Sequence, residues 1–398
     1  MNSARLRGVA ISVVTSVVCL AAVELLLRWL APVPDPYEKL KYGRPKVNQY
    51  IASDVAPHYS VVTEVEDGLP GIRGQHRYTL NNRGFRGDDL TTPKPPDEFR
   101  IFMVGGSTTE CFYLDDSESI ERVVQKALAG HPTGGRRIKV YNAGRSGDAT
   151  DDHISMIVHR IVHLEPDMII VSAGINDLSR SIYKYDYLHY VTESPKGRLP
   201  LLAMLSTEFQ LSRRVRLLMR RAVPTEQQTL EDITLKSSYG RQVALRKSVP
   251  ESNNEPANET GMYQQNLKTI VGVAQIHGAQ LILMTQQTTW NSATDPEAKN
   301  WHWMRYRDGI TYREEVLDQA MESTNDVMRK VAANYSIPLY DLSKVLPKSL
   351  EYFYDDVHFN PKGAYTTGTG LASFIVETAL NKNGRTNDLS FGRKANSQ

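Results

Sequence analysis

From Phe99 onward, short apolar runs alternate with longer stretches of helical periodicity, and this alternation restricts the fold more than any other feature. It predicts strands at 100–104, 138–141, 168–172, 280–284 and 337–341. It predicts helices near 119–128, 151–164, 262–277, 312–335 and 361–380, the last with Asn360 as its cap and Pro361 in its first turn. Strands joined through helices require right-handed crossovers, so we expect a mainly parallel sheet with helices on both faces.

The carboxyl ends of parallel strands lie at one edge of a sheet, and open α/β sheets hold their sites at this edge. Four segments follow predicted strands: "GGSTTE" at 105–110, "NAGRSGDA" at 142–149, "SAGINDL" at 172–178 and "YDDVHFNPKGA" at 354–364. Each alone has an ordinary explanation, such as a helix cap at Ser107, an Asx turn at Asn176 or a hydrogen-bonded histidine at His358. Their convergence on one edge favours a reactive site.

The residue types in these segments fit nucleophilic catalysis. A serine hydroxyl attacks well only when a base takes its proton, and His358 is the candidate base for Ser107. The imidazole needs a partner that fixes its tautomer, and Asp355 lies one short turn away. Asp356 is adjacent, but its side chain should point elsewhere, so it is the second choice.

Taken together, the four segments resemble the sequence blocks of the SGNH hydrolases, also called the GDSL esterase/lipase superfamily. The first block, usually Gly-Asp-Ser, corresponds to residues 105–107, where glycine replaces aspartate as in membrane-anchored bacterial relatives with a Gly-Gly-Ser-Thr version. The third block, Gly-x-Asn-Asp, is present at 174–177, and the fifth, Asp-x-x-His, at 355–358. The glycine of the second block matches Gly147 best, and Gly144 is a weaker choice.

This resemblance covers about 99–380 and implies a flavodoxin-like, three-layer α/β/α domain around a mainly parallel five-stranded sheet. It implies a serine hydrolase of ester bonds with the catalytic residues Ser107, His358 and Asp355. It also implies an oxyanion hole formed by the backbone N–H groups of Ser107 and Gly147 and the side-chain amide of Asn176. We expect neither a cofactor nor a metal in this chemistry.

The first 30 residues are long and apolar enough to cross a bilayer. Two arginines precede an uncharged run at 8–23, and Glu24 and Arg28 are expected to pair near the far interface beside Trp29. Basic residues ahead of the span place the N-terminus in the cytoplasm. We therefore predict an uncleaved signal anchor in the cytoplasmic membrane, with the catalytic domain on the periplasmic or extracellular side. A cleaved signal peptide is the alternative.

Other patterns exclude further classes of protein. A net charge of +2 argues against a nucleic-acid surface, and two cysteines, Cys19 and Cys111, cannot form a disulfide framework. His159 and His163 have zinc-ligand spacing without a nearby acid in a known pattern, so a solvated helix face is the better interpretation. We divide the chain into a cytoplasmic N-terminus with its anchor at 1–30, a juxtamembrane segment at 31–98, the hydrolase domain at 99–381 with an insertion at 178–261, and a polar tail at 382–398. The juxtamembrane segment is expected to hold short strands, one of them with turns at 76–90, and a proline-rich connector at 91–98.

The predicted function is a membrane-anchored serine esterase that hydrolyses O-acyl esters, in particular O-acetyl esters on carbohydrate. Three alternatives stay open: a polysaccharide O-acyltransferase with the same acyl-serine intermediate, a lipid or lysophospholipid esterase, and a non-catalytic envelope scaffold. The insertion's tyrosines, Trp301 and Trp303 offer either a sugar-stacking wall or ordinary packing. The sequence identifies no protein partner.

Overall fold

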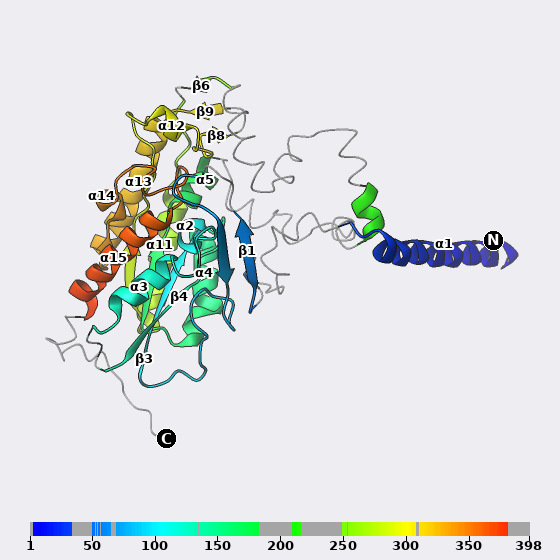
Figure 1. Cartoon of the computed structure of the whole chain (residues 1–398), viewed down its shortest axis with the longest axis horizontal. Coiled ribbons are helices and arrows are strands. Elements are labelled where there is room, and N and C mark those ends of the chain that lie inside the picture. The colour runs from blue at the N-terminus through cyan, green and yellow to red at the C-terminus, as the bar shows by residue number, and fades with distance from the viewer. Residues whose placement is uncertain are drawn as a thin grey trace. The chain divides into compact units, whose positions relative to one another are not determined.

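The computed structural model describes residues 3–33, 50–51, 53, 55, 57–64, 69–131, 133, 135–182, 209–215, 249–252, 254–307 and 310–380. The tyrosine-rich part of the insertion and the polar tail lie outside these residues. Contacts divide the chain into one unit of Met1–Tyr42 with Leu188–Ser238 and another of Gly43–Tyr187 with Tyr239–Gln398 (Figure 1).

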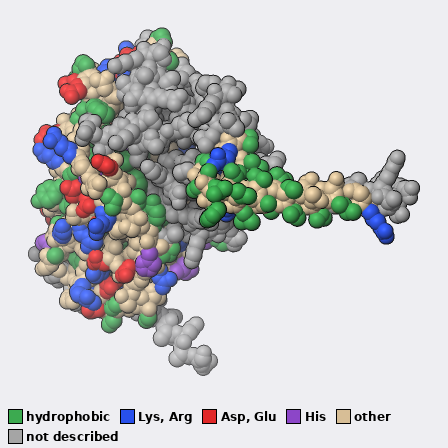
Figure 2. Space-filling model, turned by 45° about the vertical axis from the view of Figure 1, so that its right-hand side comes forward, with side chains coloured by type: hydrophobic (Ala, Val, Ile, Leu, Met, Phe, Trp, Pro, Cys, Tyr) green, Lys and Arg blue, Asp and Glu red, His purple; other side chains and the backbone are tan. Residues whose placement is uncertain are grey.

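The first unit contains the helix α1 (Ser3–Leu30). Its part Ile11–Leu30 has a mean hydropathy of 2.0 and is long and apolar enough to cross a membrane, a test that signal sequences also pass. Figure 2 shows hydrophobic side chains along this helix. Arg28 donates to Glu24 at 2.8 Å, so the predicted i,i+4 pair is confirmed.

The second unit is built on a sheet of five strands within the described residues, and all its neighbouring strands run parallel. The strands are β3 (Glu98–Gly105), β4 (Arg137–Asn142), β5 (Met168–Ser172), β7 (Gln280–Met284) and β10 (Leu339–Tyr340). Their spatial order is β10-β7-β5-β3-β4. Counted along the chain, this is the flavodoxin-like order, so the predicted fold class is confirmed.

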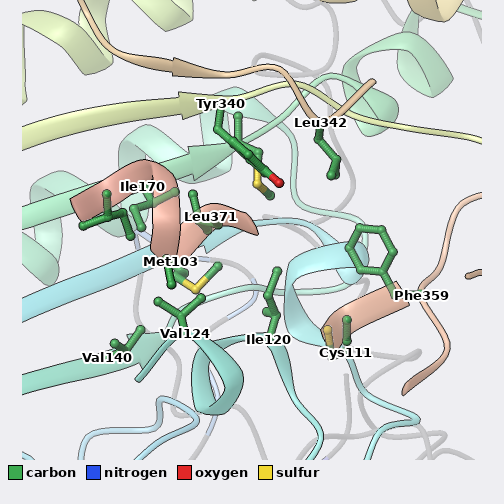
Figure 3. Close-up of a cluster of buried hydrophobic side chains, with 14 of the residues drawn as sticks. Met103, Cys111, Ile120, Val124, Val140, Ile170, Tyr340, Leu342, Phe359 and Leu371 are labelled. Atoms are coloured by element: carbon green, nitrogen blue, oxygen red, sulfur yellow. The ribbon is translucent and has the colours of Figure 1, made fainter. Parts of the chain in front are cut away.

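Helices cover both faces of this sheet. The helices of the second unit within the described residues are α2 (Ser107–Glu110), α3 (Ile120–Leu128), α4 (Thr150–His159), α5 (Ile175–Ile182), α11 (Gly261–Ile276), α12 (Pro296–Lys299), α13 (Glu314–Asn334), α14 (Leu342–Val345) and α15 (Pro361–Ile375). Alternate residues of the buried strand β3 point to opposite faces. Ile101 and Met103 pack with α3 and α15 in one cluster (Figure 3), whereas Phe102 and Val104 pack with α4, α11 and α13 in another. The sheet therefore lies between two layers of helices, which makes a three-layer α/β/α arrangement.

The helix predicted at 151–164 differs from the observed structure. α4 ends at His159, the backbone turns at Arg160, and a 3₁₀-helix η1 (Ile161–Leu164) follows. His159 and His163 therefore do not share one helix face, and the His159 ring stacks on Tyr50 with centroids 4.4 Å apart. The helix predicted at 361–380 is α15 followed by a π-helical turn, η3 (Val376–Leu380). Its predicted cap is confirmed, since Asn360 accepts the Gly363 N–H at 3.0 Å.

Of the short strands outside the main sheet, those before β3 were predicted for the segment at 31–98, whereas those after α5 were not. β1 (Ser60–Glu64) and β2 (Gln75–Thr79) pair antiparallel before the first sheet strand. Another small sheet consists of β6 (Glu251–Ser252), β8 (Tyr306–Arg307) and β9 (Ile310–Tyr312), all of which follow α5 and precede α13 in the sequence. Segments of two or three residues are too short to produce a readable alternation. α5 also runs past position 178, where the insertion was predicted to begin.

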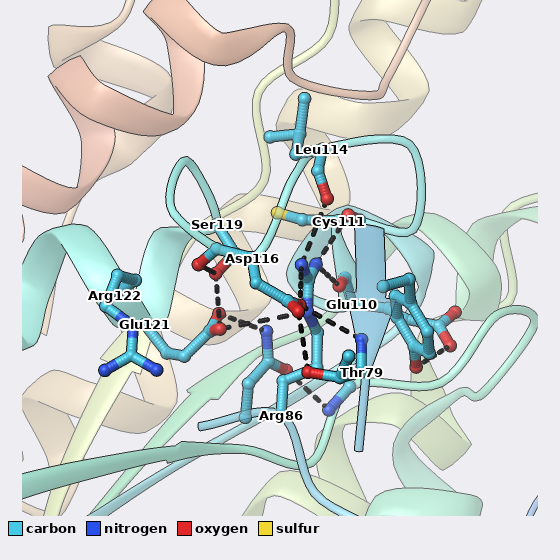
Figure 4. Close-up of polar contacts among 12 residues, drawn as sticks. Thr79, Arg86, Glu110, Cys111, Leu114, Asp116, Ser119, Glu121 and Arg122 are labelled. Atoms are coloured by element: carbon cyan, nitrogen blue, oxygen red, sulfur yellow. Dashed lines mark hydrogen bonds and ion pairs between the residues drawn. The ribbon is translucent and has the colours of Figure 1, made fainter. Parts of the chain in front are cut away.

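The segment between β2 and β3 packs beneath the turn that follows Ser107. Its Arg86 is 1% exposed, and several groups surround its guanidinium (Figure 4). They are the carbonyls of Glu110 at 3.0 Å, Cys111 at 2.7 Å and Leu114 at 3.0 Å, and the carboxylates of Asp116 at 2.9 Å and Glu121 at 3.8 Å. This segment belongs to the same compact unit as the sheet, while the predicted domain boundary at residue 98 stays a prediction.

We predict that Arg86→Met destabilises the protein by about 3–5 kcal/mol, because it leaves the buried Glu121 carboxylate without its cation. Urea unfolding of the purified protein measures this loss. Arg137→Met is the matched control: its ion pair with Asp97 is exposed, so little change is expected. Equal losses for the two variants would contradict the structural role of Arg86.

Candidate active site

The turn from β3 into α2 has no space for side chains at its two glycines. A Cβ on Gly105 would lie 2.0 Å from the Thr109 hydroxyl and 2.9 Å from the Ser172 carbonyl. A Cβ on Gly106 would lie 2.4 Å from Nδ2 of Asn176. The departure from the usual Gly-Asp-Ser block thus has a physical reason here, since any side chain at 106 collides with the Asn176 amide. Ser107 follows as the first residue of α2.

Ser107, His358 and Asp355 lie together at the carboxyl edge of the sheet. His358 Nε2 is 2.7 Å from Ser107 Oγ, and Nδ1 is 2.7 Å from Asp355 Oδ2. Asp355 is fully buried, and its Oδ1 accepts the backbone N–H groups of Val357 at 2.8 Å and His358 at 2.7 Å. With Nδ1–H donated to the carboxylate, the Nε2 lone pair faces the serine hydroxyl and can accept its proton.

Asp356, the second choice for the acid, points away from the imidazole. Its Oδ2 accepts the Met304 N–H at 2.8 Å, and its carbonyl accepts the Thr289 N–H at 3.0 Å. The carboxylate therefore holds the 300–307 segment against the loop that carries His358. Proximity in sequence alone could not separate the two aspartates.

The pKa of His358 is raised above its ordinary value of 6.5. Burial disfavours the charged imidazolium and lowers the pKa, but the charge of Asp355 and its hydrogen bond outweigh this effect. The charges of Asp356 and Glu110 raise the pKa further. The site therefore favours the imidazolium that forms when the histidine takes a proton.

The three predicted oxyanion donors lie on the serine turn and on the segments that contact it at Gly105 and Gly106. Asn176 Nδ2 donates one hydrogen to the Asp148 carbonyl at 2.8 Å and keeps a second N–H for another acceptor. Gly147 has a φ of +81°, a conformation that favours glycine. No described residue accepts from the N–H of Ser107 or Gly147. The N–H of Gly144, the weaker candidate, is already bound to Asn142 Oδ1 at 2.8 Å.

Glu110 joins the two loops that carry these donors. Its buried carboxylate accepts the backbone N–H of Ser146 at 2.9 Å and the Ser146 hydroxyl at 2.6 Å, and it accepts the Tyr78 hydroxyl at 3.0 Å. It thereby fixes the residue before Gly147 against α2. Sequence reasoning missed Glu110, because a glutamate three residues after the serine carries no distinctive signal.

Trp303 contacts the catalytic candidates directly. Its Nε1–H donates to Asp355 Oδ2 at 3.2 Å, the same oxygen that faces His358. Its ring lies nearly parallel to the His358 imidazole, at 11° with centroids 6.2 Å apart, and the Tyr354 ring does so at 7° and 5.4 Å. Trp301 packs instead against the cluster around α3 and α15. Both tryptophans therefore pack against neighbouring side chains, and the sugar-stacking wall stays a prediction.

We predict that ester hydrolysis rises with pH with an apparent pKa above 6.5, because the reaction needs neutral His358 and its pKa is raised. Trp303→Phe removes a hydrogen bond worth about 0.5–1.5 kcal/mol, which leaves more charge on Asp355 Oδ2. The profile of kcat/KM should then move up by as much as about one pH unit. Trp301→Phe is the control, and its profile should match the unmodified protein. An unchanged or downward shift in Trp303→Phe would contradict this role.

We predict that Gly106→Ala lowers kcat by displacing the Asn176 amide. Asn176→Ala should cost about 100- to 1,000-fold in kcat, as expected for one oxyanion donor. If Gly106→Ala acts through that amide, the double variant should be about as slow as Asn176→Ala alone. Steady-state kinetics of the four proteins test this, and multiplying effects would show that Gly106→Ala acts elsewhere.

The chain resembles one protein family and several solved structures. The model of the GDSL-like lipase/acylhydrolase family matches residues 103–365. None of the curated proteins matches the chain. Among solved structures, TesA is 15% identical with a TM-score of 0.39, over 69% of this chain and 97% of that one. LAE5, an alpha/beta hydrolase from the metagenome of Lake Arreo, Spain, is 15% identical with a TM-score of 0.38, over 69% and 94%. Axe2, an acetylxylan esterase from Geobacillus stearothermophilus, is 15% identical with a TM-score of 0.37, over 71% and 95%.

The family match spans the serine turn, the strand ends and the histidine loop. It covers more than half of the chain and confirms the predicted resemblance. This protein belongs to the GDSL-like lipase/acylhydrolase family and is a serine hydrolase of ester bonds.

Proposed function

We propose that this protein is a membrane-anchored esterase that removes O-acyl groups, in particular O-acetyl groups, from carbohydrate through Ser107, His358 and Asp355. One observation carries the catalytic part of the proposal. The Ser107 hydroxyl, the His358 imidazole and the Asp355 carboxylate form a continuous hydrogen-bonded chain with two contacts of 2.7 Å. The carbohydrate substrate rests on the resemblance of the Gly-Gly-Ser-Thr block and the apolar N-terminus to membrane-anchored relatives.

In the first half of the reaction, His358 Nε2 takes the hydroxyl proton while Ser107 Oγ attacks the ester carbonyl. The carbonyl oxygen becomes an oxyanion that faces the N–H groups of Ser107 and Gly147 and the free N–H of Asn176. Asp355 stabilises the imidazolium, which then gives its proton to the departing alcohol oxygen. The products are the free hydroxyl of the carbohydrate and an acyl group on Ser107.

In the second half, a water molecule gives its proton to His358 and attacks the acyl carbonyl. The same donors stabilise the second oxyanion, and the proton returns to Ser107 as the carboxylic acid leaves. A sugar hydroxyl in the place of water would make the protein an acyltransferase. The two reactions differ only in the acceptor, so their products distinguish them.

The membrane part of the proposal rests on α1. Its apolar stretch Ile11–Leu30 is exposed, and the arginines at positions 5 and 7 precede it. Such a charge bias supports a cytoplasmic N-terminus and a catalytic domain on the opposite side of the cytoplasmic membrane. Acylated cell-surface or exported polysaccharide is the substrate class that matches this location.

Labelling with a fluorophosphonate tests the nucleophile. We expect the unmodified protein to react and Ser107→Ala to remain unlabelled, because the reagent phosphonylates an activated serine. Ser117→Ala is the control, since this exposed serine binds Asp115 outside the site and should not be the labelled residue. Labelling that persists in Ser107→Ala would overturn the assignment, and no labelling of either protein would favour the scaffold.

A separate assay tests the substrate, and it uses unmodified protein that reacts with the fluorophosphonate. Release of acetate from an O-acetylated polysaccharide should exceed release of fatty acid from a lysophospholipid. Addition of an unacetylated oligosaccharide identifies transfer, which would appear as an acetylated oligosaccharide in place of free acetate. Preferential lysophospholipid hydrolysis would contradict the carbohydrate part of the proposal and leave the nucleophile unchanged.

A further inference from the structure

Glu24 is an acidic residue within the apolar stretch of α1, and it contacts a distant part of the chain. Besides the Arg28 side chain, its carboxylate accepts the backbone N–H groups of Gln210 at 2.8 Å and Leu211 at 3.1 Å. These two residues begin a helical segment at 210–215, within the predicted insertion. Because the first N–H groups of a helix have no partner inside it, a carboxylate at this position stabilises the helix start.

The same segment also binds the chain that leaves α1. The Gln210 side chain accepts the Val33 N–H at 2.6 Å and donates to the Val33 carbonyl at 3.2 Å. Arg213 donates to the Val33 carbonyl at 3.0 Å, and Arg214 donates to the Ala31 carbonyl. Guanidinium groups at the carboxyl end of a helix are favoured by its dipole. The two helices therefore stabilise each other's ends.

The position of these contacts along α1 gives the depth of the segment. Glu24 lies six residues before Leu30, the end of the apolar stretch, which corresponds to about 9 Å along the helix. Amphipathic helices that lie in a membrane interface are buried about 5–10 Å into the boundary between headgroups and acyl chains. The start of the 210–215 helix is therefore at the depth of that boundary if α1 spans the bilayer.

The surface of residues 209–215 has the composition expected at a membrane interface. Phe209, Leu211 and Val215 are 41%, 37% and 47% exposed, although they are large and apolar. Hydrophobic side chains surround the end of α1 together with arginine (Figure 2). Apolar side chains beside arginines are typical of helices that bind anionic lipid surfaces.

Resting on the membrane anchoring proposed above, we propose that residues 209–215 are a second membrane contact, an interfacial helix held on α1 by Glu24. Phe209, Leu211 and Val215 enter the upper acyl chains, and Arg213 and Arg214 lie at the level of the lipid phosphates. The occupant of this surface is an anionic phospholipid bilayer. The insertion thus returns the chain to the membrane at a point 177 residues after Val33.

Lipid-dependent quenching tests this proposal in the full-length protein. Leu211→Cys and Val215→Cys, each in a Cys19→Ser background, are labelled with an environment-sensitive fluorophore in phosphatidylcholine–phosphatidylglycerol vesicles. Buried Cys111 stays in place, since burial also raises its pKa to about 12. Both labels should lose fluorescence to lipids with a nitroxide high on the acyl chain. Ile276→Cys is the matched control, because this residue of α11 is apolar and 84% exposed, and its label should not be quenched.

Native Cys19, labelled in the unmodified protein, separates the two proposals. It lies about 16 Å from the end of α1, so a nitroxide deep in the bilayer should quench it. Quenching at Cys19 but not at 211 or 215 would overturn the interfacial helix and leave the anchor. No quenching at Cys19 would refute the anchor itself.

Glu24→Ala provides the second arm of the test. Loss of the carboxylate should abolish the quenching of the label at 211 while the Cys19 label stays quenched. Glu24→Gln keeps one acceptor oxygen and should retain part of the effect. Unchanged quenching at 211 in Glu24→Ala would show that Glu24 does not hold the segment. Fluorophosphonate labelling of each variant reports that the catalytic unit is folded.

Discussion

The close approach between the β3–α2 turn and Asn176 is the constraint on which the rest of the site depends. Gly105 and Gly106 leave no room for a side chain, so the turn lies directly against the end of β5 and the amide of Asn176. Ser107 is consequently placed at the sheet edge, next to the Asn176 amide and within hydrogen-bond distance of His358. A looser turn would separate the nucleophile from the donors, and small displacements of this kind cost much of the rate.

Buried polar side chains hold this turn in place. Arg86 binds the carbonyl of the last residue of α2 and two carbonyls after it, and Glu110 joins α2 to the loop of Gly147. Such groups are costly to bury unless they are paired, so the network is stable only as a complete arrangement. Arg86 and Tyr78 precede the residues that the family model matches. The segment before β3 therefore packs against the serine turn within the same compact unit.

The sheet and the candidate triad were readable from the sequence for different reasons. Strands such as β5 and β7 are buried on both faces and appear as continuous apolar runs, so even their ends agree with the prediction. The triad follows because parallel strands bring Ser107 and His358 to one edge although they are 251 residues apart. The predicted helix at 151–164 was wrong in its second half, since periodicity does not reveal a turn at Arg160.

The sequence by itself determined where the strands and helices of the sheet domain lie along the chain, which polar residues follow the strands, and that the N-terminal helix is apolar. These features depend on local periodicity and residue type. Only the tertiary structure decided that Asp356 binds Met304, that Trp303 binds the carboxylate of Asp355, and that Glu24 meets Gln210. Each of these contacts depends on where side chains point after the chain has folded. A hydrogen bond between distant residues requires both direction and distance, and neither is encoded in spacing along the chain.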